Sequence, residues 1–548
     1  MQLQQTLRRG WSHITLAVIL LATYGAMAVR GFNLGLYSDV LAYIWHYETR
    51  GIRGGMNWLV VEHWQRHLAG ALASAPIQVL FPGDDAIWFA IALGLHFTNA
   101  FLFFAFVDDW TRGKYRMVVF VGVLLFAFDT LQIDSHLTFG TATHRKASMT
   151  LTIVFLWLYM RYVRGDRQRM VLYSFSLLAF SLGNAIYEQA LLLFLIFPLF
   201  ALIEDWQKPV VKPWWRYGLR VAFEMFPFGF FVLSYAYLID VLFISSNVEA
   251  SAGYVVGQVG GAVNAMLNPL AIVTRIGTVF TSAWIVLAAL VTAVLAALLW
   301  RWGHRTESMQ SGSWQLLALG AGIMLLNAVS VAPTDFSLVT APRLVYTAGL
   351  GSGLLIAALL DWLRRVIPSR QAGGVVFAGV SALIIGTGAA HFFQQQQFYL
   401  VRDDAREAVK AAIYTALPGW DEETPPYLLI ITDAHPFDDL ALYAQDIGFP
   451  FMFDLMYSTE GILADAVYTD IEASPETSGQ HIIATAEGII SPLRPDLRID
   501  PARLVVISYS STSDTAEVLD TVPPDVLADG NLHTEVPFTW ETNLDYLD

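Results

Sequence analysis

Long apolar runs separated by short polar segments dominate the first 400 residues. Most of these runs are close to the roughly 20 residues that an α-helix needs to cross a bilayer. We therefore predict about 11 transmembrane helices, and we interpret the first as an uncleaved anchor. The runs lie near residues 14–31, 86–108, 115–133, 147–163, 170–186, 188–204, 218–243, 277–300, 314–333, 344–361 and 373–392.

The hydrophobic pattern changes after residue 400, where the apolar runs become short. Two of them have the length of β-strands and two segments have helical periodicity. The strands are expected at Tyr427–Thr432 and Leu504–Tyr509, and the helices at Asp403–Ala416 and Leu440–Tyr457. This pattern predicts a transmembrane domain over 1–400, with a first outer loop at 31–85, followed by a soluble α/β domain over 401–548.

Composition excludes most other classes of protein. The chain has 548 residues, of which 55% are hydrophobic and 14% charged, and its mean hydropathy is +0.50. Soluble domains are usually about a quarter charged, so the composition indicates a polytopic α-helical membrane protein. The chain has no cysteine, which excludes disulfides and thiolate metal ligands. These features are typical of a multi-pass protein of a prokaryotic plasma membrane.

Positive charge predicts the orientation of the chain in the membrane. Alternate loops between the predicted helices hold 18 Lys and Arg residues, and the opposite loops hold 8. Cytoplasmic loops carry the excess of Lys and Arg, so we expect the amino terminus in the cytoplasm. An odd number of spans then places the carboxy-terminal domain outside the cell.

The carboxy-terminal region is strongly acidic. From Phe393 onward it holds 6 of the 32 basic residues and 28 of the 47 acidic ones. Such a region repels nucleic acids and anionic lipids, so no nucleic-acid partner is expected. Asp433, His435, Asp438 and Asp439 follow the first predicted strand. We interpret them as ordinary loop and capping residues rather than a metal site.

Polar chemistry is concentrated in the stretch Gly31–Gly70, after the first predicted span. It contains Asp39, Arg66 and His67 in an otherwise apolar chain, and we interpret it as a catalytic loop at the outer membrane surface. A carboxylate there can act as a general base toward a hydroxyl group. The alternative is that Asp39 caps a helix over Val40–Arg50, because Asp is a good N-cap residue.

Several short motifs follow one another along the first 400 residues. They are Arg66-His-Leu-Ala-Gly-Ala-Leu, Leu80-Phe-Pro-Gly, Leu93-Gly-Leu-His-Phe-Thr-Asn-Ala, Ser181-Leu-Gly-Asn-Ala-Ile-Tyr-Glu-Gln-Ala and Ala341-Pro-Arg-Leu-Val-Tyr-Thr-Ala-Gly. Their order resembles that in the GT-C superfamily of membrane glycosyltransferases, in particular the bacterial relatives of the protein O-mannosyltransferases. The resemblance covers about residues 10–400. His67 stands where the family usually has proline, and Tyr187 where lysine is common.

The resemblance implies an inverting glycosyltransferase that moves a sugar from a polyprenyl-phosphate donor to an acceptor at the outer face of the plasma membrane. Asp39 is the expected general base. The other expected substrate-binding residues are Arg343, Tyr346, Glu188, Arg145, Lys146, Arg66 and His67. The acceptor class stays open between protein, lipid and polysaccharide.

Cations are needed to hold and stabilise the lipid phosphate. Arg343, Arg145 and Lys146 are the expected ones, but for Arg145 and Lys146 the capping of helix C-termini or contact with lipid headgroups is an equal alternative. No motif for a tightly bound metal occurs, whereas several family members use a divalent ion, so metal dependence stays open.

Two further segments have structural interpretations. His96 and Asn99 lie one helical turn apart and are expected to form hydrogen bonds between helices. Ser245–Gly277 is a long segment with four glycines before its last residue. It is expected to be a loop, either a flap over the lipid donor or simply flexible.

Two other functions fit the same chain. One is a catalytically inactive GT-C-like scaffold that binds an envelope partner, and the other is a secondary transporter. In the enzyme, Asp39, Arg343 and Glu188 should converge on one outward-facing cavity. In the other two cases they should be scattered.

Overall fold

The computed structural model describes most of the chain. The described residues are 2–32, 51, 53, 76–77, 79–81, 84–131, 142–165, 168–206, 214–242, 251–305, 313–332, 345–420, 424–433, 453, 456–457, 462–468, 482–491, 494–528 and 532–543. Contacts divide the chain into two compact units. The first unit includes Ala86–Gln397, and the second includes Phe398–Asp548.

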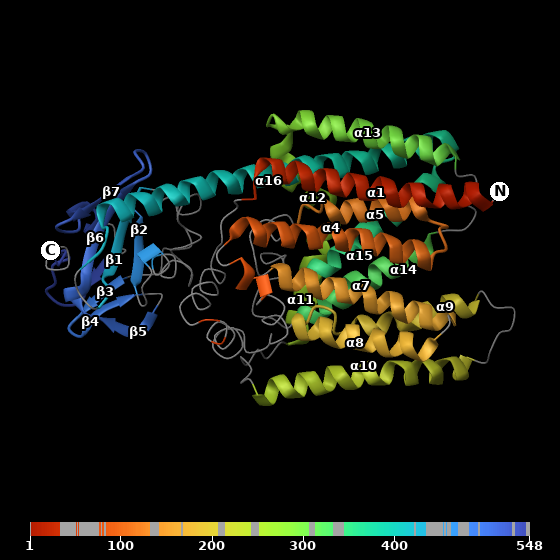
Figure 1. Cartoon of the computed structure of the whole chain (residues 1–548), viewed down its shortest axis with the longest axis horizontal. Coiled ribbons are helices and arrows are strands. Elements are labelled where there is room, and N and C mark those ends of the chain that lie inside the picture. Colours follow the sequence, from red (N-terminus) through yellow and green to blue (C-terminus); the bar gives the residue numbers. More distant parts are fainter. Residues whose placement is uncertain are drawn as a thin grey trace. The chain divides into compact units, whose positions relative to one another are not determined.

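The first unit is a bundle of helices that run side by side in alternating directions (Figure 1). α16 begins in this unit and ends in the second. The helices are α1 (Gln2–Arg30), α4 (Asp85–Trp110), α5 (Arg116–Ala127), α7 (Ala142–Arg164), α8 (Arg169–Ile186), the 3₁₀ helix η2 (Leu193–Ile196), α9 (Phe197–Trp206), α10 (Trp214–Leu242), α11 (Ala252–Leu267), α12 (Pro269–Phe280), α13 (Trp284–Arg305), α14 (Trp314–Val331), α15 (Tyr346–Val366) and α16 (Arg370–Ala416).

The structure confirms a polytopic helical membrane protein. Among the described residues, eight helices are long and apolar enough to cross a membrane, or nine if the bent pair α11–α12 counts as one span. This is fewer than the expected 11. Three expected spans are not among the eight. The run at 115–133 forms the 12-residue α5, the run at 147–163 lies in α7, which does not meet the criterion for a span, and the run at 188–204 is broken into η2 and the 10-residue α9. Apolar composition alone does not determine where a helix stops.

The expectation of a loop at Ser245–Gly277 is wrong for residues 251–277, the part that the structure describes. These residues form α11 and the first part of α12. α11 and α12 meet at an angle of 52°. At the bend, the Asn268 side chain accepts a hydrogen bond from the Leu270 backbone N–H, and Pro269 is the first residue of α12. This combination is a strong helix start. Packing compensates for the helix-weakening glycines, because one face of α11 is buried against α14 and α15.

Glycines allow α5, α14 and α15 to approach one another closely. A Cβ atom at Gly351 of α15 would lie 2.5 Å from the Gly320 carbonyl oxygen of α14. A Cβ atom at Gly353 would lie 2.5 Å from the Gly122 carbonyl oxygen of α5. Small residues at such contacts are typical of packed membrane helices. This packing places the start of α15 beside the end of α5.

Several ion pairs lie at one end of the bundle (Figure 1). At this end α4, α7 and α15 end, and α5 and α8 begin. The ion pairs are Asp108–Arg116, Asp109–Arg164, Arg220–Glu224, and Asp361 with Arg364 and Arg365. These cations belong to the set that the sequence assigns to the cytoplasm. The starts of α7 and α15 lie at the opposite end, and which compartment each end faces stays a prediction.

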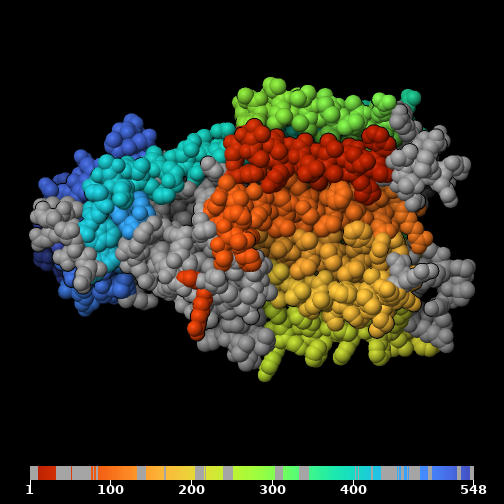
Figure 2. Space-filling model, in the orientation of Figure 1, coloured from red at the N-terminus to blue at the C-terminus, as the bar shows by residue number. Residues whose placement is uncertain are grey.

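α10 lies at the edge of the bundle, and its side chains stand out from the surface (Figure 2). Phe223 is 80% exposed and Phe226 70% exposed, as expected for a face in contact with lipid. Glu224, on the inner side of α10, accepts hydrogen bonds from the hydroxyl groups of Tyr159 at 2.7 Å and Tyr162 at 2.9 Å. A polar contact therefore attaches α10 to α7.

The second unit contains two four-stranded sheets. The first has the strand order β2-β1-β6-β7, with β1 parallel to both β2 and β6 and with β7 antiparallel to β6. The second has the order β5-β4-β3-β8, with β3 and β8 parallel. The strands are β1 (Tyr427–Thr432), β2 (Leu463–Tyr468), β3 (Ile482–Thr485), β4 (Gly488–Ser491), β5 (Arg494–Ile499), β6 (Leu504–Ser510), β7 (Thr515–Leu519) and β8 (Leu532–Thr534), with the short helix α19 (Pro524–Ala528).

The structure confirms the predicted α/β character of this region. β1 has the predicted bounds and β6 extends the predicted strand by one residue, while the helix expected at Asp403–Ala416 is the last part of α16. Most of the helix expected at Leu440–Tyr457 lies outside the described residues.

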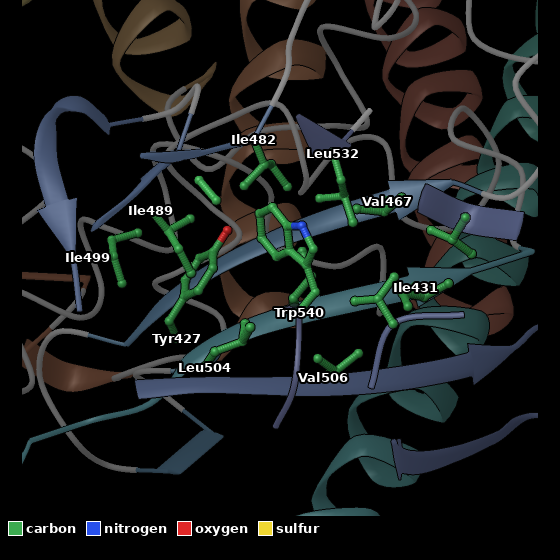
Figure 3. Packing of buried hydrophobic residues seen from close by; sticks show 14 residues of the cluster. Tyr427, Ile431, Val467, Ile482, Ile489, Ile499, Leu504, Val506, Leu532 and Trp540 are labelled. Atoms are coloured by element: carbon green, nitrogen blue, oxygen red, sulfur yellow. The ribbon is translucent and has the colours of Figure 1, made fainter. Parts of the chain in front are cut away.

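Side chains from both sheets meet in one apolar core (Figure 3). Tyr427 and Ile431 come from β1, Leu504 and Val506 from β6, and the buried Trp540 lies among them. Opposite them, β3, β4, β5 and β8 contribute Ile482, Ile489, Ile499 and Leu532. The strands that the apolar runs predict are therefore the central strands of a sheet that packs on a second sheet.

One carboxylate is buried in this region. Asp465 of β2 is 3% exposed and accepts hydrogen bonds from Tyr427 Oη at 2.7 Å and from Ser491 Oγ of β4 at 3.1 Å. Burial raises the pKa of the Asp465 carboxyl from 3.8 to about 6, although the two hydrogen bonds partly oppose this effect. Asp465 thus connects the two sheets through a polar contact.

Candidate functional site

The structure describes four of the eight residues predicted for the site. Asp39, Arg66, His67 and Arg343 lie outside the described residues. Their roles, and the convergence of Asp39 and Arg343 with Glu188 on one cavity, therefore stay predictions. The four described residues are Arg145, Lys146, Glu188 and Tyr346.

Arg145 and Lys146 are the fourth and fifth residues of α7. They therefore do not lie at the C-terminus of their own helix, and the alternative that they cap another helix stays a prediction. The N-terminal end of a helix carries a partial positive charge, and its first N–H groups have no partner within the helix. Two cations at this position are unfavourable alone and favourable only when an anion binds beside them.

Lys146 is an unusual cation because it is only 1% exposed. Its Nζ atom has no hydrogen-bond partner among the described residues. Arg145 is half-buried, and its Nε and Nη1 atoms also have no such partner in the described part of the chain. The Arg145 guanidinium lies 4.9 Å from the centre of the Tyr187 ring.

Polar side chains of α4 hold the start of α7 and the start of α15. Asn99 Nδ2 donates to the Lys146 carbonyl oxygen at 2.8 Å, and His96 Nδ1 lies 2.7 Å from Tyr346 Oη. His96 Nε2 lies 3.1 Å from the Ala127 carbonyl oxygen. A carbonyl only accepts, so in the neutral ring Nε2 carries the hydrogen and Nδ1 accepts from the Tyr346 hydroxyl. The interhelical role predicted for His96 and Asn99 is confirmed.

The segment Tyr187–Leu192, between α8 and η2, is non-helical and is held by side chains from other helices. Gln189 Nε2 donates to the Arg145 carbonyl oxygen at 2.7 Å, and Asn327 Nδ2 donates to the Gln189 carbonyl oxygen. Asn327 Oδ1 also accepts from the backbone N–H of Ala348 at 3.0 Å. Irregular backbone inside a membrane bundle needs such internal partners. These bonds connect the starts of α7 and α15.

Glu188 lies in the same non-helical segment but points to a different helix. Its Oε1 accepts a hydrogen bond from the Tyr235 hydroxyl of α10 at 2.9 Å. This contact supports a role in attaching α10. The predicted role of Glu188 in lining a substrate cavity stays a prediction.

Asp129 is a further, partly buried acidic group that the motif analysis does not single out. It lies in the turn after α5, where its Oδ1 accepts from the Leu131 backbone N–H at 3.0 Å. Its Oδ2 is buried and has no hydrogen-bond partner among the described residues. A sequence signal exists, because an acidic residue inside a predicted span, here 115–133, usually faces a cavity or a partner.

These residues form one contiguous polar cluster at the end of the apolar bundle. We use "polar cluster" for His96, Asn99, Asp129, Lys146 and Tyr346. His96 connects its members: it is bonded to Tyr346 and to Ala127, two residues before Asp129, and it is close enough to Lys146 to interact with it electrostatically.

The polar cluster contains the buried Lys146 amine and the partly buried Asp129 carboxyl group, and the Lys146 Nζ and Asp129 Oδ2 atoms have no hydrogen-bond partner among the described residues. It can therefore bind an anion and a hydroxyl group in an apolar environment. Among the described residues, no group of three or more His, Asp or Glu side chains is placed to hold a metal ion.

A scan against known protein families finds no match for the chain, and a search of curated proteins finds no similar sequence. The likeness to GT-C glycosyltransferases therefore remains a resemblance of motifs, and the functional argument depends on the site itself.

Proposed function

We propose that the chain is an inverting glycosyltransferase that uses a polyprenyl-phosphate sugar as donor and acts at the outer face of a prokaryotic plasma membrane. The observation that carries the proposal is the buried Lys146, which has no partner among the described residues and lies at the positive end of α7 beside Arg145. A buried charge is costly unless it is paired. The donor phosphate would supply the missing anion.

The location of these cations supports a lipid-linked anion. They lie at the end of a bundle in which eight of the described helices are long and apolar enough to span a bilayer. A polyprenyl chain within the bilayer would bring its phosphate to this level. A soluble sugar nucleotide would have no such anchor.

The proposed reaction assigns one task to each group. The acceptor hydroxyl attacks the anomeric carbon, the bond between this carbon and the phosphate oxygen breaks, and polyprenyl phosphate leaves. Asp39 takes the proton of the hydroxyl. Lys146, Arg145 and Arg343 stabilise the charge that develops on the leaving phosphate.

The test is a transfer assay with purified protein and a panel of radiolabelled polyprenyl-phosphate sugars. We expect labelled product with at least one donor. Asp39→Asn should lower turnover by about 10²–10⁴ without weakening donor binding, because an amide cannot accept the proton. Lys146→Gln should weaken donor binding. If Asp39 is only a helix cap, the Asn variant will be fully active, since Asn caps as well as Asp.

One observation favours a secondary transporter as the second candidate. The described residues contain two interrupted helical segments, Tyr187–Leu192 and the bend at Asn268, and transporters build their substrate sites from such segments. However, the first interruption follows the full 18-residue length of α8, whereas transporter sites lie near the bilayer midplane. A transporter would move a substrate into vesicles and form no glycosylated product. Donor binding without transfer or uptake would support an inactive scaffold.

A further inference from the structure

Asp129 has a chemical feature that the phosphate site does not explain. Its Oδ1 is held by the Leu131 N–H, whereas Oδ2 is buried and has no hydrogen-bond partner among the described residues. Buried polar atoms in native proteins nearly always have a partner, so an unsatisfied one indicates a bound group. An anionic oxygen needs a hydrogen-bond donor rather than another anion.

Arg275 of α12 does not fill this position. Its Nε donates to Thr130 Oγ1 at 3.2 Å, and its Nη2 donates to the Ala265 carbonyl oxygen at 2.8 Å across the α11–α12 bend. It interacts with Asp129 electrostatically. Arg275 thus leaves Asp129 Oδ2 without a hydrogen bond from its guanidinium.

Gly349 of α15 lies beside Asp129 Oδ2. A Cβ atom at Gly349 of α15 would lie 3.4 Å from Asp129 Oδ2 and 3.3 Å from the Phe126 ring. Any larger residue at 349 would place apolar atoms against Oδ2. The position next to this oxygen therefore depends on the absence of a side chain at 349.

We propose that Asp129 Oδ2 accepts a hydrogen bond from a hydroxyl group of the donor sugar, while Lys146 holds the donor phosphate. This inference rests on the proposed function and names the residue that recognises the sugar. A sugar presents hydroxyl donors, and hydrogen bonds to an ionised carboxylate are among the strong ones. The two groups belong to the same polar cluster, so one ligand with a phosphate next to a sugar can satisfy both.

The test compares two lipids that differ only in the sugar. The dissociation constants of a polyprenyl-phosphate hexose and of bare polyprenyl phosphate are measured with the full-length protein in detergent. Wild-type protein should bind the hexose lipid about 10- to 100-fold more tightly, as expected for a hydrogen bond to a charged group. Asp129→Asn should reduce this preference to about one and leave binding of the bare lipid unchanged. Lys146→Gln should weaken both lipids equally and keep the preference.

A second variant leaves the carboxylate in place. Gly349→Ala should reduce the preference for the hexose lipid because its methyl group occupies the space beside Oδ2. Gly257→Ala is the matched control, since a Cβ atom at Gly257 meets nothing within 4 Å, and it should bind both lipids as wild type does. An unchanged preference in both Asp129→Asn and Gly349→Ala overturns the inference about Asp129. If neither lipid binds the wild-type protein, the proposed function fails and this inference fails with it.

Discussion

The buried Asp465 makes the stability of the second unit depend on pH. The carboxyl has a pKa of 3.8 in its ordinary state and about 6 in the fold. Between these values the folded chain keeps a proton that the unfolded chain has lost. The free energy of unfolding should therefore fall as the pH rises from about 4 to 6. Above pH 6, Asp465 should contribute no further change with pH.

The size of the effect follows from the same two values. Each pKa unit corresponds to about 1.4 kcal/mol, so ionisation of buried Asp465 costs about 3 kcal/mol at pH 7.5. Asp465→Asn removes this cost. It also removes one acceptor for the hydroxyl groups of Tyr427 and Ser491, which costs about 1 kcal/mol. The variant should therefore be more stable than wild type by about 2 kcal/mol at pH 7.5, and less stable at pH 4.

The assay is urea unfolding of residues 398–548, the carboxy-terminal part of the second unit, between pH 4 and 8. The fluorescence of Trp540 reports on the core, because this side chain is only 3% exposed. The region is strongly acidic, so general repulsion also changes with pH. The difference between wild type and Asp465→Asn isolates the single group.

Asp433→Asn is the matched control. The Asp433 carboxylate is exposed and accepts hydrogen bonds from the Ser511 N–H and the Ser510 hydroxyl, which lower its pKa below the usual value. Its contribution to stability is present above pH 4 and is lost only at lower pH, so the curve from pH 4 to 8 should keep its shape. Equal slopes for wild type and Asp465→Asn would refute the assignment of the pH dependence to Asp465.

Three further predictions concern the membrane part. Gly351→Ala should destabilise the protein by about 1–3 kcal/mol in detergent melts, because its Cβ would meet backbone atoms of α14, whereas Gly257→Ala should leave the melting temperature unchanged or raise it slightly. Glu224→Ala should destabilise by about 3 kcal/mol because it leaves the partners of a buried carboxylate unsatisfied; the same melts measure this, and an unchanged melting temperature would contradict it. A reporter fused after Asp548 should be active only if it is exported, and cytoplasmic activity would contradict the predicted orientation.

Local sequence patterns were sufficient to predict the membrane helices, the central strands and the grouping of cations at one end of the bundle. A long apolar run has to become a membrane helix because its backbone must be satisfied internally in lipid. The bounds of β1 and most of β6 could be predicted because short buried strands have continuous apolar runs. The cations that follow α4 and those in the last turns of α7 and α15 could be grouped because charged side chains avoid the hydrocarbon core.

The helix starts were less predictable. The glycines of α11 suggest a loop, but the helix forms because its other face is buried by distant helices. Arg145 and Lys146 could be recognised as candidate cations, yet their position at a helix start depends on where α7 begins. That point has no strong capping signal in the sequence.

The sequence by itself determined a polytopic membrane protein with an acidic α/β region after it, because hydrophobicity and charge act on each segment separately. Only the tertiary structure decided that His96 contacts Tyr346, that Gly349 lies beside Asp129 Oδ2, and that neither Lys146 Nζ nor this oxygen has a hydrogen-bond partner among the described residues. These properties depend on contacts between residues as much as 250 positions apart. A local pattern carries no information on such contacts, because burial and pairing are set by whatever other helices bring alongside.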